Sequence, residues 1–566
     1  MDHKTFRGYT LKGFSHKQQL GLLGIFLLAC GVRFYGINFG LPNTLCRPDE
    51  EYLIMIALRF FSGDFNPHFF NYPTLYLYLL FGIYLCYFLI RIALGGTVAE
   101  FLTEIALSPT SFFLLARGFS AFLGALTTIL VFLIVKRLFD NKTAVLSAFF
   151  MSVAYLHVRD SHFGTTDVAM TFFIMWATLS IITCYHTQKV RDYIIAGVLT
   201  GLATGTKYGG ILLVFPTMLA YFMNHGEPLL KQIKAKQLWL YGLTAVISFV
   251  ISSPFILFDV TTFLKDFLYE LHHVTKAQGV IAMRGWWYHS RYTLLYGVGW
   301  GMFLTSFAGV VISAKQDLRR ALVLYLFPAL FFLIAGQGYT VYLRYMLPLL
   351  PFICIASATF VVYLQNTFVK ALTRKNLLPI LACIVAMPSL YNVMLFDCLI
   401  SKTDNRVLVA DWINRHIPAG SKIYRSGSLF GQVQLNFSIE SLEEQYQEVL
   451  RKGGTGRLLQ IKIDHVKKTE PQGGYRDWKY DEHEGIFAEN FLPDYIILQK
   501  SPLTFRNDVP VQIMKLLQER YHLIQAFEVV NVTSPDHWYN QMDAFYVPFI
   551  GFKDIERPGP NLYIYQ

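Results

Sequence analysis

Acidic side chains stand beside two long apolar segments of this chain. Asp49 and Glu50 follow the first such segment, and Asp167 opens a later one. Ionised groups held against a bilayer are costly and are usually functional. A carboxylate can accept the proton of an attacking hydroxyl, so acids that share one membrane face predict an active site.

The same acids also have a structural interpretation. An Asp before an apolar run caps a helix well, and carboxylates are favoured at the positive end of the helix dipole. Asp49 fits this description or that of a solvated loop acid, and Asp167 fits an N-cap. Both interpretations stay open from the sequence.

Composition predicts the class of protein that must position these groups. Of the 566 residues, 54% are hydrophobic, 16% are aromatic and only 15% are charged, which is far from a soluble globular average. We therefore expect a polytopic α-helical membrane protein. Apolar stretches near the roughly 20-residue spanning length predict about eleven spans, close to 19–37, 112–135, 143–158, 168–186, 193–206, 208–223, 238–253, 294–313, 321–335, 345–363 and 377–394.

The formal net charge of +11 is explained by where the basic residues lie. They precede the first span and recur in every second short loop, and positive loops stay cytoplasmic. The pattern predicts a cytoplasmic N-terminus, and it explains the positive charge without a nucleic-acid partner. It leaves Asp49, Asp167, the loop 254–293 and everything after about 395 on the opposite face. The clusters are Lys4, Arg7, Lys12 and Lys17; Lys136, Arg137 and Lys142; Lys189 and Arg191; Lys231, Lys234 and Lys236; Lys315, Arg319 and Arg320; Lys370, Arg374 and Lys375.

One further segment, 75–94, is long and apolar enough to span. If it does, every later element is inverted, and Asp167 lies on the other side of the membrane from Asp49. Its six aromatic residues, its Arg91 end and the acidic, non-basic stretch that follows favour a helix in the outer interface instead. We adopt the interfacial interpretation.

Hydropathy falls from about residue 400, so the chain divides into a transmembrane domain at 1–399 and a soluble domain at 400–566. Residue patterns in the second part predict an α/β module. Residues 451–485 are rich in Gly and charged residues and are interpreted as a mobile loop or insertion. The predicted helices are 407–417 and 509–520, and the predicted strands are 421–425, 493–499 and 561–565.

Several short motifs occur in a fixed order along the transmembrane part. They are RPDE at 47–50, NYP at 71–73, ARGFS at 116–120, SHFGTTD at 161–167, GTKY at 205–208 and LRYMLP at 343–348. With these motifs, the chain resembles membrane glycosyltransferases of the GT-C superfamily. More closely, it resembles bacterial relatives of protein O-mannosyltransferases and lipid A aminoarabinose transferases, which use a polyprenyl-phosphate sugar donor. The tail is similar to that of some bacterial members through 404–413 and 556–560.

The resemblance implies an inverting hexosyl or pentosyl transferase of the GT-C fold. Asp49 matches the acid that takes the acceptor proton in such enzymes. Glu50 beside it is expected to be a metal ligand, an acceptor contact or an alternate base. Asp167 matches the second acid, which orients the acceptor or a divalent cation.

A lipid-phosphate leaving group needs cationic partners near the interface. Three residues are candidates for this phosphate contact: Arg344, Lys207 and Arg117. A guanidinium can bind phosphate oxygens with two hydrogen bonds at once. The structural alternative for all three is a basic side chain that extends to the interface without a catalytic role.

Substrate contacts are expected from aromatic and polar residues near these groups, namely Tyr72, His162, Tyr345 and Trp287. His162 stands where the mannosyltransferases carry Arg, and Trp287 fits either sugar stacking or an aromatic belt. The sequence assigns no cofactor, but a divalent cation stays open, with His272, His273 and Asp167 as ligands. Asn71 stands where the aminoarabinose transferases carry a Glu ligand, which weakens the metal assignment.

The expected partners are a polyprenyl-phosphate sugar, membrane lipids, and an acceptor that is a lipid, a glycan or a protein. We expect the bacterial cytoplasmic (inner) membrane, with the active site and the C-terminal domain on its extracytoplasmic side. Two alternatives remain: a lipid-linked sugar transporter or flippase, and a non-catalytic glycan-assembly subunit. The first is disfavoured because we find no internal repeat, and the second because both acids are retained.

Overall fold

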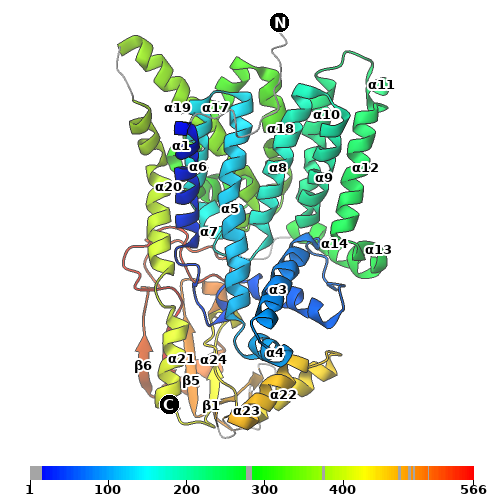
Figure 1. Ribbon diagram of the computed structural model, residues 1–566. Helices are drawn as coiled ribbons and strands as arrows, with labels where there is room; N and C mark the ends of the chain where they lie inside the picture. Colours follow the sequence, from blue (N-terminus) through cyan, green and yellow to red (C-terminus); the bar gives the residue numbers. More distant parts are fainter. Residues whose placement is uncertain are drawn as a thin grey trace.

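The computed structural model describes residues 16–275, 283–372, 377–469, 473–481, 486–488, 491–507 and 509–566. Figure 1 shows an upright bundle of helices above a smaller region that contains a sheet. Between the two lies a layer of shorter helices and loops. The fold is therefore mostly helical with a small C-terminal sheet region, as expected.

Each predicted span overlaps helical structure. The corresponding elements are α1 (His16–Phe34), α5 (Thr110–Leu138), α6 (Asn141–Ser152), α8 (Thr166–Thr187), α9 (Val190–Thr206), the 3-10 helix η4 (Tyr208–Leu213) with α10 (Val214–Phe222), α12 (Lys236–Ser252), α17 (Gly299–Gln316), α18 (Leu318–Ala335), α19 (Leu350–Leu372) and α20 (Leu378–Ile400). Six helices of the described chain are long and apolar enough to cross a membrane, or seven if the bent pair 285–297 and 299–316 is one span. The predicted count of eleven therefore stays a prediction.

Shorter elements fill the layer below the bundle and the loops above it. They are η2 (Thr44–Cys46), α2 (Glu50–Arg59), η3 (Phe60–Ser62), α3 (Leu75–Ala93), α4 (Val98–Leu107), α7 (Tyr155–Asp160), α11 (Leu229–Ile233), α13 (Phe255–Phe258), α14 (Val260–Thr275), α15 (Gly285–Tyr288), the π-helix η5 (His289–Leu294), α16 (Leu295–Gly297) and η6 (Leu343–Leu349).

Helix α3 is the segment whose placement decides the topology. It passes the length and composition test for a span, although only 28% of its most apolar window is buried. Figure 1 shows it in the lower layer, near α4 and α14, and not among the upright helices. This position agrees with the predicted interfacial helix.

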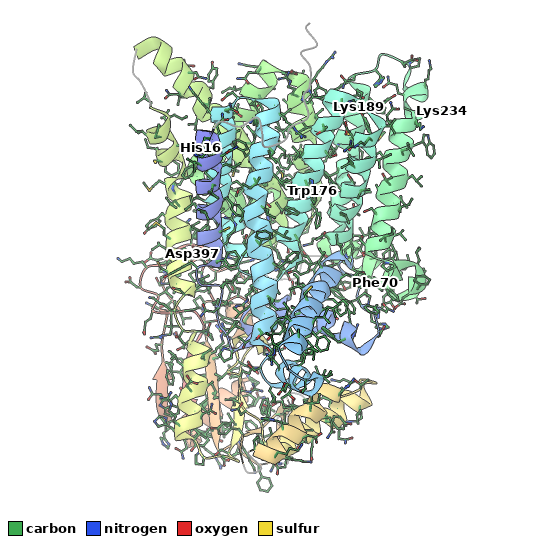
Figure 2. All side chains as sticks on the ribbon, viewed as in Figure 1. His16, Phe70, Trp176, Lys189, Lys234 and Asp397 are labelled. Carbon is green, nitrogen blue, oxygen red and sulfur yellow. The ribbon has the colours of Figure 1, made fainter. Side chains whose placement is uncertain are left out.

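Two of the basic loops, at Lys189 and Lys234, lie at the same end of the bundle (Figure 2). Figure 2 shows His16, Lys189 and Lys234 at the end away from the C-terminal region, whereas Phe70 and Asp397 lie toward that region. This separation is the one that the charge pattern predicted, because basic loops stay on a single side of the membrane.

The C-terminal region contains a five-stranded sheet in the order β2-β1-β5-β7-β6. Strands β2, β1 and β5 are parallel, and β7 is antiparallel to both of its neighbours. The three predicted strands and two predicted helices are confirmed as β1 (Lys422–Arg425), β5 (Tyr495–Lys500), β7 (Asn561–Tyr565), α21 (Asn405–His416) and α24 (Val511–Arg520). The remaining elements are η7 (Leu429–Gly431), α22 (Ile439–Arg451), β3 (Tyr480–Asp481), β4 (Ile486–Phe487), η9 (Thr504–Arg506) and β6 (Leu523–Phe527).

The interpretation of 451–485 as a loop is wrong in part. This stretch contains α23 (Arg457–Thr469) and the edge strand β2 (Arg476–Asp477). Helix α23 has its apolar residues on one face and packs against α4, so its charged residues are those of a half-exposed helix. The loop prediction rested on the content of glycine and charged residues, which does not reveal the helical spacing of the apolar residues.

The irregular stretch 528–560 returns from the sheet to the bundle. Phe545 and Phe549 are buried in the same hydrophobic core as the membrane helices, and the Tyr155 hydroxyl donates a hydrogen bond of 2.9 Å to the Phe549 carbonyl. The predicted boundary at 399/400 falls at the end of α20, but the packing of the two parts is continuous across it.

Candidate active site

Asp49 occupies the position just before α2, but it does not act as a side-chain cap. Its φ of 69° lies in the left-handed region, and within the described chain its side chain makes no capping hydrogen bond to α2. Such backbone strain in a non-glycine residue is concentrated at functional sites. The carboxylate instead accepts a 2.7 Å hydrogen bond from Arg344 Nη2. Asp49 is thus the N-cap residue of α2 by position, but its carboxylate does not cap the helix.

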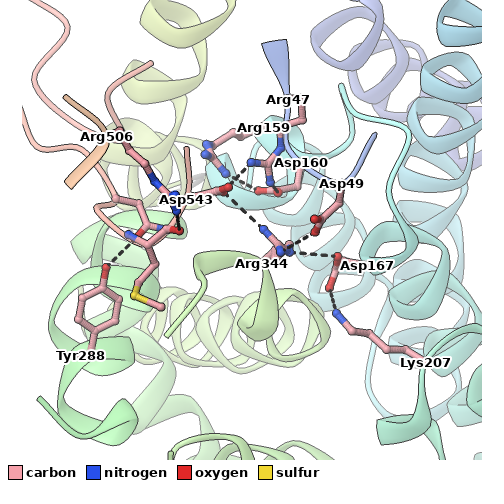
Figure 3. Close-up of polar contacts among 12 residues, drawn as sticks. Arg47, Asp49, Arg159, Asp160, Asp167, Lys207, Tyr288, Arg344, Arg506 and Asp543 are labelled. Carbon is pink, nitrogen blue, oxygen red and sulfur yellow. Dashed lines mark hydrogen bonds and ion pairs between the residues drawn. The ribbon is translucent and has the colours of Figure 1, made fainter. Parts of the chain in front are cut away.

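Arg344 lies in η6 and is the centre of a charged cluster (Figure 3). Its three guanidinium nitrogens each face a different carboxylate. Nη2 lies 2.7 Å from Asp49, Nε lies 3.9 Å from Asp167, and Nη1 lies 3.5 Å from Asp543. The residue is 5% exposed, so these contacts hold its charge in a site that is largely closed to solvent.

Asp167 and Lys207 form the next pair in this cluster. Thr165 is the residue that precedes α8, and Asp167 stands in its first turn, so Asp167 is not the N-cap. Its carboxylate lies 2.6 Å from Lys207 Nζ. That ammonium also lies 5.1 Å from the ring centroid of Tyr72 and 4.9 Å from that of Tyr345, which is within the range of cation–π attraction.

A cavity of about 470 Å3 opens beside the cluster. Asp49, Tyr72, Arg344 and Tyr345 line it, so four of the predicted site residues share one space. Leu429 and Phe430 of the C-terminal region also line the cavity. The site is thus enclosed by both parts of the chain. Its other lining residues include Glu51, Tyr52, Phe69, Asn71, Glu270 and Tyr342.

The chain resembles one family model and several solved structures. Residues 98–258 match the family model described as dolichyl-phosphate-mannose-protein mannosyltransferase. The apo structure of ArnT from Cupriavidus metallidurans is similar over 97% of this chain and 98% of its own, with a TM-score of 0.52 and 13% identity. At 13% identity, this similarity concerns the fold alone. No curated protein sequence matched this chain.

Two other structures are similar to a smaller share of this chain. The archaeal oligosaccharyltransferase AglB from Archaeoglobus fulgidus, in complex with an inhibitory peptide and a dolichol-phosphate, matches 71% of this chain with 15% identity and a TM-score of 0.47. The chain spans 58% of that protein. ArnT from Cupriavidus metallidurans bound to undecaprenyl phosphate matches 71% of this chain and 73% of its own, with 14% identity and a TM-score of 0.45.

Glu50 and Arg117 form an ion pair with each other and do not line the cavity. Arg117 donates hydrogen bonds of 2.8 and 2.7 Å to the two Glu50 oxygens, and Gly164 N donates another of 2.7 Å. Arg117 also donates to the carbonyls of Ile37 and Phe39. Both side chains are fully buried. The hydrogen-bonding groups of Glu50 and Arg117 are therefore already occupied within the protein, so the two residues do not fit the predicted roles of catalytic acid and phosphate ligand. We assign the pair to positioning the loops around α2.

Two predicted substrate contacts do not line the cavity. His162 is fully buried, with Nδ1 3.0 Å from the Val158 carbonyl and Nε2 2.9 Å from the Tyr35 carbonyl. Trp287 is 73% exposed on the surface, which fits the aromatic belt better than sugar stacking.

The predicted metal ligands are not gathered in the described part of the chain. Asp167 contacts Lys207 and Arg344, and the exposed His272 places Nδ1 2.7 Å from the Leu268 carbonyl of its own helix. The side chain of His273 lies outside the described residues. Among the described residues, no three His, Cys, Asp or Glu side chains are arranged to hold a metal ion.

The sequence prediction missed Asp543 and Arg47. Arg47 Nη1 donates a hydrogen bond of 2.5 Å to Asp543, and both are buried. Burial alone raises the pKa of Asp543, but Arg47 and Arg344 outweigh it and hold the pKa below its usual range. The sequence does give a signal for Arg47, because this charged residue stands two positions before Asp49. No local signal marks Asp543, because it lies in an irregular stretch far along the chain.

Proposed function

We propose that this protein is an inverting glycosyltransferase, which moves a sugar from a polyprenyl-phosphate donor to an acceptor at the outer face of the membrane. The observation that carries the proposal is the convergence of Asp49, Asp167, Arg344 and Lys207 in one charged cluster, beside a cavity that Asp49 and Arg344 line. These are the acid and cationic groups that such a transfer needs.

Arg344 and Lys207 are the proposed partners of the donor phosphate. Within the described chain, the buried Arg344 Nη1 has no hydrogen-bond partner, so it can donate a hydrogen bond to a phosphate oxygen without breaking an existing one. The family model that matches 98–258 is named for a lipid-phosphate-linked mannose donor. These observations support a phosphate headgroup beside η6.

The lipid part of the donor would need an apolar surface close to the same residues. A groove of about 880 Å3 lies along α9, α10 and α12, and Tyr208, the neighbour of Lys207, lines it. Its walls are almost entirely apolar, as the lining residues Ile211, Trp239 and Phe249 illustrate. A polyprenyl chain in this groove would place its phosphate near Lys207.

The proposed reaction transfers one proton to Asp49 and one electron pair to the leaving phosphate. Asp49 takes the proton of the acceptor hydroxyl as the acceptor oxygen attacks the anomeric carbon from the face opposite the phosphate. The bond between that carbon and the phosphate oxygen breaks, and the electron pair leaves with the phosphate. Arg344 and Lys207 stabilise the resulting charge, while Asp167 keeps Lys207 in place.

The outer face is proposed from the charge distribution. The basic loops at Lys189 and Lys234 lie at the end of the bundle away from the C-terminal region (Figure 2), and basic loops stay cytoplasmic. A soluble nucleotide sugar in the cytoplasm would not reach acids on the other side. A lipid-phosphate sugar carried across a bacterial cytoplasmic membrane would reach them.

The test is sugar transfer in proteoliposomes that contain the purified protein. A panel of radiolabelled polyprenyl-phosphate sugars is offered to membrane lipid and protein acceptors, with wild type, Asp49→Asn and Asp64→Asn compared. Asp64 is an exposed acid whose carboxylate contacts His68, so it serves as a matched control. We expect transfer by wild type and Asp64→Asn and a loss of at least about 100-fold in Asp49→Asn, with all three equally folded.

Two outcomes would contradict this function. Equal transfer by wild type and Asp49→Asn would remove Asp49 as the base. If no donor in the panel is consumed while labelled donor crosses the vesicle bilayer, the protein is a lipid-linked sugar transporter.

A further inference from the structure

The stretch 528–560 carries one carboxylate of the C-terminal region into the charged cluster. Asp543 is 3% exposed, and the same oxygen, Oδ2, lies 2.5 Å from Arg47 Nη1 and 3.5 Å from Arg344 Nη1. Figure 3 shows Asp543 on the side of Arg344 away from Lys207. Arg344 is therefore contacted by acids from three separate segments of the chain.

The turn around Asp543 is held from both parts of the molecule. Asn540 Oδ1 accepts hydrogen bonds of 3.2 Å from the Met542 amide and from the Tyr288 hydroxyl of α15. Arg506 of the C-terminal region donates to the Met542 carbonyl at 3.5 Å. The Asp543 amide closes the turn by donating to the Asn540 carbonyl at 3.2 Å. These bonds leave the carboxylate little freedom to move.

A simpler role for Asp543 would be to balance the charge of Arg47. Arg47, however, has a second acid, Asp160, at 3.6 Å, and its guanidinium lies within 4.9 Å and 5.1 Å of the ring centroids of Phe163 and Phe545. Arg344 depends more on Asp543, because only Asp543 faces its Nη1 atom among the described residues. Asp49 and Asp167 face its other two nitrogens.

We infer that Asp543 is a positioning residue for the donor site: it orients the Arg344 guanidinium toward the lipid phosphate. The C-terminal region is then part of the donor site and not merely a cover over it. This inference rests on the proposed function, since it takes a lipid phosphate as the ligand of Arg344. It assigns Asp543 no contact with the reacting atoms.

The test measures how well the full-length protein in nanodiscs distinguishes undecaprenyl phosphate from undecaprenol. The ratio of the two dissociation constants reports on the phosphate contact and is insensitive to the lipid tail. The decisive variant is Asp543→Asn with Arg47→Gln, which keeps the wild-type net charge while removing the carboxylate. Asp536→Asn is the matched control, because Asp536 is an exposed acid of the same stretch.

We expect the double variant to lose about 10-fold or more of the preference for undecaprenyl phosphate, with undecaprenol binding unchanged, and Asp536→Asn to match wild type. An unchanged preference in the double variant would overturn the inference and leave Asp543 as a partner of Arg47 alone. If the double variant does not fold, Asp543→Glu displaces the carboxylate at constant charge. A loss of the preference for undecaprenyl phosphate in this variant would then support the inference, and an unchanged preference would overturn it. A wild type without preference for the phosphate would overturn the proposed function itself.

Discussion

Arg344 and Arg117 show how similar residues acquire different roles. Both are arginines beside apolar segments, and both were predicted to contact phosphate. In the structure Arg117 is occupied by Glu50 and two carbonyls, whereas Arg344 lines the cavity. The difference lies in the surroundings of each guanidinium, which a sequence motif does not describe.

Arg344→Ala is expected to weaken use of the donor strongly. Removing a guanidinium that stabilises a developing phosphate charge costs about 100- to 1,000-fold in turnover, and donor KM should rise as well. Both are measured by transfer in proteoliposomes at varied donor concentration. Unchanged kcat and donor KM would exclude Arg344 from the phosphate site.

Arg117→Gln is expected to destabilise the fold instead. Breaking a fully buried ion pair leaves the Glu50 charge without its partner, which costs about 3–5 kcal/mol. Thermal unfolding in detergent measures this loss, and the donor KM of the remaining folded protein should stay near wild type.

The control for Arg117 is Arg91→Gln. Arg91 is 39% exposed in its pair with Glu104, and exposed pairs contribute about 1 kcal/mol or less. A raised donor KM in Arg117→Gln with wild-type stability would restore the phosphate role to Arg117.

At the scale of elements, the packing of α9 on α12 positions Lys207. Gly197, Gly201 and Gly205 repeat every fourth residue along α9, and a side chain on any of them would meet α12 at 2.1–2.4 Å. Small residues at such spacing let membrane helices approach closely. Because Lys207 directly follows α9, this contact positions the backbone from which its side chain extends.

Gly201→Ala is therefore expected to destabilise the bundle. The added methyl would lie 2.4 Å from the Ala245 carbonyl oxygen, and overpacking of this kind costs about 1–3 kcal/mol. Gly242→Ala on α12 is the control, since its added methyl would meet nothing within 4 Å. Thermal unfolding of the two variants side by side measures the difference. Equal melting temperatures would show that the two helices do not need this close contact.

At the scale of the whole molecule, the C-terminal region encloses the cavity and supplies Asp543. Leu429 and Phe430 line the cavity, and Phe545 and Phe549 pack in the core of the bundle. The region and the cavity must therefore lie on the same side of the membrane.

Cysteine labelling of intact cells tests this topology. Lys553→Cys, on an exposed position of the C-terminal region, should react with a membrane-impermeant maleimide above the wild-type background. Lys189→Cys, also exposed but at the opposite end (Figure 2), should react only after the membrane is permeabilised. The reverse pattern would place the cavity in the cytoplasm and contradict the proposed donor.

Much of the arrangement could be predicted from the sequence. The apolar stretches lie in helices, and the alternating basic loops correctly separated one end of the bundle from the other. Asp49, Asp167, Arg344 and Lys207 were all selected as site residues, since charge next to a bilayer is rare and therefore conspicuous. Glu50 and Arg117 were selected by the same signal, which does not distinguish a buried pair from an open site.

The sequence by itself determined the membrane class and the presence of an α/β tail, because hydropathy and strand periodicity act locally along the chain. Only the tertiary structure decided which charges are partners. Ion pairing depends on distances between segments that are remote in sequence, as for Arg344 with Asp49 and Asp543. Whether a charge is free to bind a ligand or already bound within the protein is therefore settled by packing.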